Sequence, residues 1–142
     1  MPLELAQIRR RVQTRLADVK RAAATRRERV AAAERAYDTF LSQIATPTMN
    51  AVAQSLSAEG HPFKVFTPGA VVRMVSDRSN RTYLELRLDT GGPTPQVVAE
   101  VGRERGSRVL TDERPLGGGA QVDTLTDEDV VAIVLESLDD LI

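Results

Sequence analysis

Residues 5–44, LAQIRRRVQTRLADVKRAAATRRERVAAAERAYDTFLSQI, decide the fold class of this 142-residue chain. No glycine or proline interrupts them, and apolar residues recur at steps of three and four. The steps fall at Leu5, Ile8, Val12, Leu16, Val19, Ala23, Val30, Ala33, Tyr37, Phe40 and Ile44, with Arg26 between Ala23 and Val30. This spacing predicts one long, coiled-coil-like helix. One extra residue between Val12 and Leu16 is typical of a stutter.

The length of this helix predicts that it needs a partner. About 42 helical residues form a rod of roughly 60 Å, whereas a 100-residue globule has a radius of gyration near 13 Å. We therefore expect a homo-oligomer, with an antiparallel hairpin bent near Arg26 as the alternative. The expected oligomer interface consists of Leu5, Ile8, Val12, Leu16, Val19, Val30, Tyr37, Phe40 and Ile44.

The next segment is predicted to be a separate, shorter helix. Thr46-Pro47 indicates a stop and a restart, because threonine is a good N-cap and proline is tolerated in the first turn. Gly60 is the expected C-terminal cap. Residues 1–60 would then form a helical oligomerisation segment, with the short helix packed back on the end of the long one.

From Phe63 onward the apolar period changes from 3.6 to 2, which predicts strands. We expect four or five of them, at residues 63–66, 71–76, 82–89, 97–101 and 109–111. Connections this short allow only antiparallel hairpins, so the sheet should be a meander with one solvated face. A final helix, capped by Thr126 with Asp129 three residues on, should cover the face that carries Leu84, Leu86 and Leu88. The expected architecture is therefore α+β, with residues 61–142 as the sheet domain.

Composition excludes several classes of protein. The chain has no cysteine and one histidine, which rules out disulfide scaffolds, cysteine-ligated metals, thiol catalysis and histidine-rich metal sites. No signal pattern or long apolar stretch is present, so a cytoplasmic protein with no membrane association is expected. Charge is unevenly distributed: residues 1–45 carry ten basic and five acidic side chains, and residues 46–142 carry nine and fifteen.

Candidate catalytic groups are few. Asp89-Thr90-Gly91 resembles the catalytic triplet of aspartic proteases, which would imply two such carboxylates sharing one proton across a dimer axis. Arg87 departs from that pattern, and the same letters are an ordinary turn at the end of a strand. His61 could be a general base or a helix-capping residue, and the acidic residues near Asp127 are explained by capping without a metal. No cofactor and no metal site are expected.

Arginines in the long helix are the remaining candidates for binding. Arg9, Arg10, Arg11, Arg26 and Arg27 could contact a polyanion such as a nucleic-acid backbone. They could equally form a solvated coiled-coil exterior, or bind the acidic tail of another copy. No aromatic residue lies among them, which argues against stacking on single strands.

The sequence thus predicts a non-enzymatic scaffold protein that self-associates through its N-terminal helix and joins a larger assembly with a protein partner of unknown identity. The alternatives are a nucleic-acid-associated protein and, more remotely, a dimeric hydrolase at Asp89.

Overall fold

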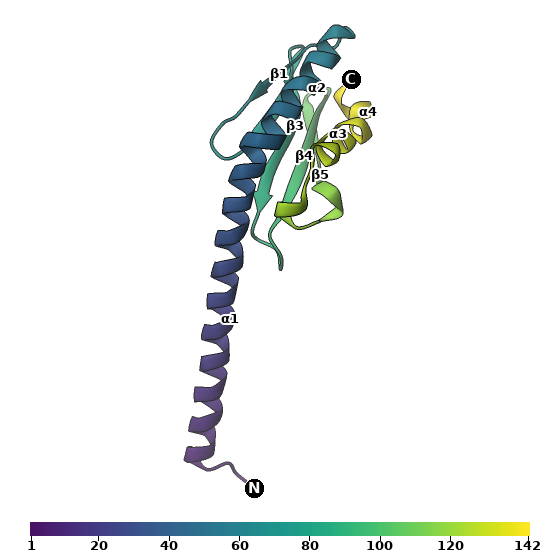
Figure 1. Cartoon of the computed structure of the whole chain (residues 1–142). Coiled ribbons are helices and arrows are strands. Elements are labelled where there is room, and N and C mark those ends of the chain that lie inside the picture. Colours follow the sequence, from purple (N-terminus) through teal and green to yellow (C-terminus); the bar gives the residue numbers. More distant parts are fainter. The chain divides into compact units, whose positions relative to one another are not determined.

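A computed structural model describes residues 1–142 and shows an α+β fold (Figure 1). Helix α1 (Leu5–Phe40), a π-helical turn (Leu41–Ala45) and α2 (Thr46–Ala58) come first. Strands β1 (Phe63–Phe66), β2 (Val72–Ser76), β3 (Ser79–Asp89), β4 (Gln96–Arg105) and β5 (Arg108–Pro115) follow. Two 3₁₀ turns (Leu116–Gly118 and Val122–Thr124), α3 (Asp127–Glu136) and α4 (Leu138–Leu141) complete the chain. The expected architecture is confirmed.

The expected break at Thr46-Pro47 is wrong, because the backbone stays helical there. Thr46 has φ −65° and ψ −49°, and its N–H bonds to the carbonyl of Leu41, five residues back. Proline lacks an N–H and its ring crowds the carbonyl four residues before it. The wider π turn ends at Ala45, directly before Thr46-Pro47, and changes the hydrogen-bond pattern at the point where an α-helix would break.

The five strands form a meander in the order β1-β2-β3-β4-β5, with every neighbouring pair antiparallel. Strands β3, β4 and β5 are longer than expected. Asp77-Arg78 alone turns the chain between β2 and β3, and Gly106-Ser107 turns it between β4 and β5. Gly106 has φ +64°, a conformation that costs glycine little. Because both turns are tight, residues expected in loops belong to strands.

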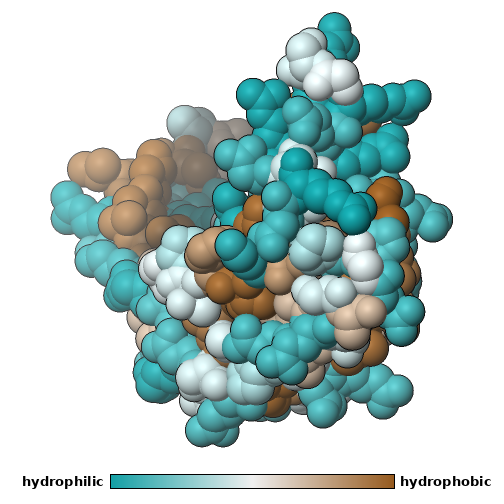
Figure 2. All heavy atoms as spheres, turned by 90° about the horizontal axis from the view of Figure 1, so that it is seen from above, coloured by the Kyte–Doolittle hydropathy of each residue, from teal (hydrophilic) through white to brown (hydrophobic).

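One face of the sheet carries the core. Leu84 pairs with Val101, and Leu86 pairs with Ala99 and Val72, so these apolar side chains share a face. They form one buried cluster with Met49 of α2 and with Val130, Ile133 and Val134 of α3. The expectation that the last helix covers the leucine face is confirmed. Seen from above, hydrophilic residues make up most of the surface, and apolar residues show between them (Figure 2).

The chain divides into two compact units, Met1–Ala32 and Ala33–Ile142. The expected boundary at residue 60 falls inside the second unit, because Met49 and Ala53 of α2 lie in the same core as the strands. The second unit therefore includes the last turns of α1, the π turn and α2.

Two expected caps are confirmed. Gly60 has φ +90°, and the N–H groups of Gly60 and His61 donate to the carbonyls of Ser57 and Leu56, which is a Schellman ending. At the start of α3, Thr126 is the N-cap. The Asp129 carboxylate accepts the Thr126 N–H at 2.9 Å. These caps fix the ends of the helices that cover the sheet.

Candidate interaction surfaces

The first candidate surface is an apolar seam on α1, which we define as Leu5, Ile8, Val12, Leu16 and Val19. These side chains are between 43% and 70% exposed. A helix advances about 100° per residue, so Ile8 and Leu16 mark the edges of a stripe about 80° wide. Val30 continues this stripe and is half-buried. A row of exposed large apolar side chains makes this stripe a candidate for contact with a partner.

Three residues of the expected oligomer interface, Tyr37, Phe40 and Ile44, pack against other parts of their own chain. For these three residues the expectation of an oligomer contact is wrong. Tyr37 and Phe40 are 2% exposed, in one cluster with the sheet residues. The Tyr37 hydroxyl lies 2.6 Å from the carbonyl of Ala70 and 3.3 Å from that of Leu86. Ile44 packs against the same cluster. The C-terminal end of the apolar repeat is therefore buried against the sheet.

The arginines predicted to bind polyanions do not gather on one side of α1. Arg9 and Arg27 share one side of the helix, Arg11 lies about 160° away, and Arg10 lies opposite the apolar seam. Arg26 falls on the seam's own side. Their side chains are exposed. The structure brings these residues to one helix but not to one patch.

Basic side chains line both edges of the seam, a pattern that the linear run of arginines does not show. Arg9, Lys20 and Arg27 follow one edge, and Arg11, Arg15 and Arg29 follow the other. The two acidic residues of this stretch are Asp18 and Glu28. Asp18 lies 3.2 Å from the guanidinium of Arg21, and Glu28 lies on the side away from the seam.

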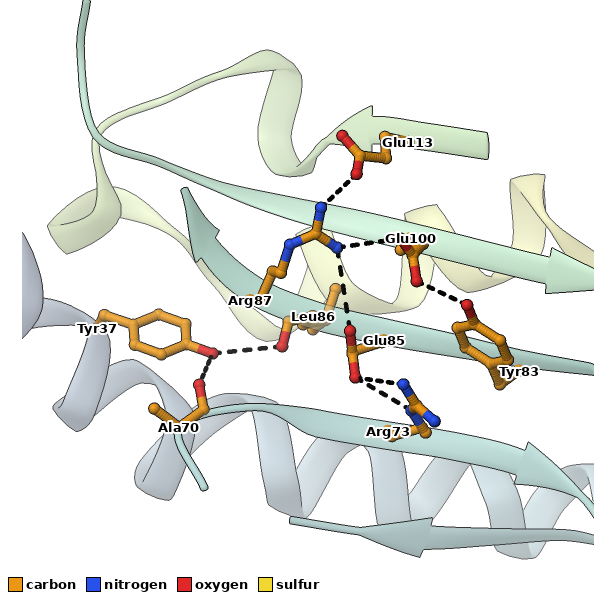
Figure 3. A network of polar contacts seen from close by, with 9 residues as sticks. All are labelled: Tyr37, Ala70, Arg73, Tyr83, Glu85, Leu86, Arg87, Glu100 and Glu113. Atoms are coloured by element: carbon orange, nitrogen blue, oxygen red, sulfur yellow. Dashed lines mark hydrogen bonds and ion pairs between the residues drawn. The ribbon is translucent and has the colours of Figure 1, made fainter. Parts of the chain in front are cut away.

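The second candidate surface is a polar network on the other face of the sheet (Figure 3). Arg87 of β3 contacts three glutamates, Glu85, Glu100 and Glu113, from three adjacent strands. Arg73 of β2 binds Glu85 at 2.9 Å. Alternation along the strand puts Glu85 and Arg87 on the face opposite Leu84 and Leu86, but it does not give their partners, because the partners are set by strand register.

Aromatic packing completes this network. The Tyr83 hydroxyl donates to Glu100 at 2.6 Å, and the guanidinium of Arg73 lies 4.5 Å from the centre of the Tyr83 ring. Burial, and then the hydrogen bond to Glu100, raise the pKa of Tyr83 to about 12. Glu85 is only 8% exposed although it lies on the face away from the helices. The charges of this face are paired with one another, which gives the network a structural role.

Two candidate catalytic residues remain, Asp89 and His61. Asp89 Oδ1 accepts the N–H of Gly91 at 2.9 Å, which closes the turn after β3. His61 lines an open cavity of about 360 Å³ together with Arg78, Arg103 and Asp140. There Arg103 pairs with Asp140 at 3.3 Å, and Arg78 donates to the carbonyl of Gly60.

The chain has neither a cluster of metal ligands nor a helix that could cross a membrane. No group of three or more histidine, aspartate or glutamate side chains is placed to hold a metal ion. None of the helices combines the length and the apolar character needed to cross a membrane. Comparison with protein-family models, curated proteins and solved structures gave no match.

Proposed function

We propose that this chain is a non-enzymatic scaffold protein whose N-terminal helix pairs with other helices through the seam, self-association being the simplest form of that pairing. One observation carries the proposal: five large apolar side chains lie exposed in one narrow stripe of a continuous helix. A stripe confined to two positions per heptad is the pattern of a coiled-coil seam, whereas a helix that covers a globular core has a wider apolar face.

Self-association should become stronger as the salt concentration rises. Basic side chains line both edges of the seam, so two copies repel at low ionic strength while their apolar residues attract. Salt reduces the Debye length from about 10 Å at 0.1 M to about 3 Å at 1 M. We therefore expect sedimentation velocity at micromolar concentration to show a monomer at low salt and a larger species near 1 M salt.

Substitutions separate the seam from the rest of the helix. Val12→Asp with Leu16→Asp places charges in the contact and should abolish the larger species. Gln13→Asp with Ala17→Asp is the matched control, because it has the same spacing and adds the same charge outside the seam. A monomer at every salt concentration, or equal loss in both variants, would contradict self-association through the seam.

A second candidate function is binding to a nucleic-acid backbone, which the excess of basic side chains favours. Residues 5–30 carry nine basic and two acidic side chains, a net charge of +7. Each phosphate contact contributes about −0.9 to the slope of log affinity against log salt, so five contacts give roughly −4 to −5. Such binding would draw on Arg10, opposite the seam, as much as on Arg9, and it would not need Val12 or Leu16.

A further inference from the structure

The charges along both edges of the seam restrict what can occupy it. Every basic side chain beside the seam, from Arg9 to Arg29, lies where the flank of a paired helix would face it. In a parallel pair, one edge of a helix faces the opposite edge of its partner; in an antiparallel pair, like edges face each other. Both orientations set basic groups against basic groups when the partner is a second copy.

The acidic residues within residues 5–30 do not relieve this repulsion. Asp18 is paired with Arg21, and Glu28 lies on the far side from the seam. A second copy is therefore a poor occupant at ordinary ionic strength, although the apolar residues themselves suit a helix.

The acidic end of the chain does not fit the seam either. Residues 121–142 hold seven acidic side chains and no basic one. The apolar face of α3, however, consists of Val130, Ile133 and Val134, and these are already buried in the core of their own unit. A copy docking through its folded α3 could offer charges but no free apolar stripe.

We propose that the seam is a docking site for a helix of another protein whose own apolar stripe is flanked by glutamate or aspartate on both sides. This inference rests on the proposed function and names its partner chemistry. Apolar residues of both helices would be buried between them, and the acidic flanks would pair with Arg9, Lys20 and Arg27 on one edge and with Arg11, Arg15 and Arg29 on the other. The narrowness of the stripe suits a helix, since a helix lying on a lipid surface needs a broader apolar face.

Two designed peptides test the proposal directly. Both have four heptads with isoleucine and leucine at the seam positions; one carries glutamate at every flanking position and the other carries lysine there. Like charges within each peptide discourage it from pairing with itself. Fluorescence anisotropy with the full chain should give an affinity for the glutamate peptide at least about tenfold higher near 0.1 M salt, and the preference should shrink near 1 M.

Matched variants locate the preference on the seam. Arg15→Glu with Arg27→Glu reverses charge on both edges and should remove most of the preference for the glutamate peptide. Arg10→Glu with Arg21→Glu makes the same charge change on the opposite side of the helix and should leave the preference nearly intact. Equal losses in the two variants would mean that only overall charge matters, which overturns the proposal.

Other outcomes distinguish this inference from the function on which it rests. Equal affinity for both peptides, lost in Val12→Asp with Leu16→Asp, would overturn the acidic partner and leave pairing through the seam standing. No binding to either peptide, with no self-association near 1 M salt, would reject both. Tighter binding to duplex DNA or to vesicles rich in anionic lipid than to the glutamate peptide, unaffected by the seam substitutions, would overturn the inference in favour of a polyanion.

Discussion

Gly102 of β4 lies opposite Tyr83 of β3, and the tyrosine ring occupies the space where a side chain at position 102 would stand. A Cβ atom built on Gly102 would lie 2.7 Å from Cζ of Tyr83, closer than two carbon atoms approach without repulsion. The same ring packs on the guanidinium of Arg73, and its hydroxyl group donates a hydrogen bond to Glu100. A glycine inside a strand thus permits a close approach on which the polar network depends.

Gly102→Ala is expected to destabilise the protein by about 1–3 kcal/mol, because the ring must move and both of its contacts weaken. The free energy of unfolding in urea measures the effect. Combining the change with Tyr83→Ala is the control. Without the ring, alanine should be neutral or favourable at position 102, since alanine restricts the unfolded chain more than glycine does. An equal cost in both backgrounds would show that the ring is not the cause.

The two tyrosines should ionise late in the folded protein. Burial, then the bond to Glu100, raise the pKa of Tyr83 to about 12. Burial, then the charges of Glu85 and Asp38, raise the pKa of Tyr37 further. Because the folded state holds these protons more tightly than the unfolded state, this contribution to stability is complete below pH 10, the ordinary tyrosine pKa, and is lost as the pH rises toward 12 and beyond.

The chain contains two tyrosines and no tryptophan, so tyrosinate absorbance reports on Tyr37 and Tyr83 alone. We expect little tyrosinate at pH 10 in the folded protein and about half ionisation at that pH in strong denaturant. Tyr83→Phe should lessen the fall in stability above pH 10. Half-ionised tyrosine at pH 10 under native conditions would contradict this account.

At the scale of elements, periodicity predicted that helices and strands exist more reliably than it predicted where they end, and the single final helix that it indicated is divided into α3 and α4. The spacing of apolar residues revealed α1, and alternation revealed the strands. The prediction at Thr46-Pro47 was wrong because these residue types favour the start of a new helix, whereas the helical backbone continues there through a π turn. Residues 79–81 and 112–115 carry letters common in loops, and they became strand because tight turns at Asp77-Arg78 and Gly106-Ser107 pair them with neighbours.

The spacing of the apolar residues in α1 could not predict which of them are buried and which are exposed. Tyr37 and Val12 occupy equivalent positions in the repeat, yet one is buried by the sheet and the other is exposed. Burial of Tyr37 depends on contacts between residues far apart in sequence, such as Tyr37 with Leu86. The pairing of Arg87 with Glu113 depends in the same way on the register of two successive hairpins. The basic residues along both edges of the seam could have been predicted from the sequence, by assigning each charged residue its angle around the helix.

At the scale of the whole molecule, the two compact units predict which part of the chain folds alone. Residues 33–142 contain the whole of the buried cluster, whereas residues 62–142 lack Tyr37, Phe40, Ala45, Met49 and Ala53. Truncating one large buried side chain costs about 2–5 kcal/mol, and a small domain is stable by only about 5–15 kcal/mol. The loss of these five residues therefore exceeds what the sheet and α3 can supply, although those residues have apolar faces of their own.

We expect the 33–142 fragment to unfold in one cooperative transition, with a urea midpoint close to that of the full chain, because residues 1–32 add no member to the buried cluster. The 62–142 fragment should show no such transition and should bind a hydrophobic dye, since the leucine face of its sheet is left partly uncovered. Circular dichroism and dye fluorescence compare the three proteins under identical conditions. A 62–142 fragment as stable as 33–142 would place the domain boundary near residue 60. It would also show that the sheet does not need α2 or the end of α1 in order to fold.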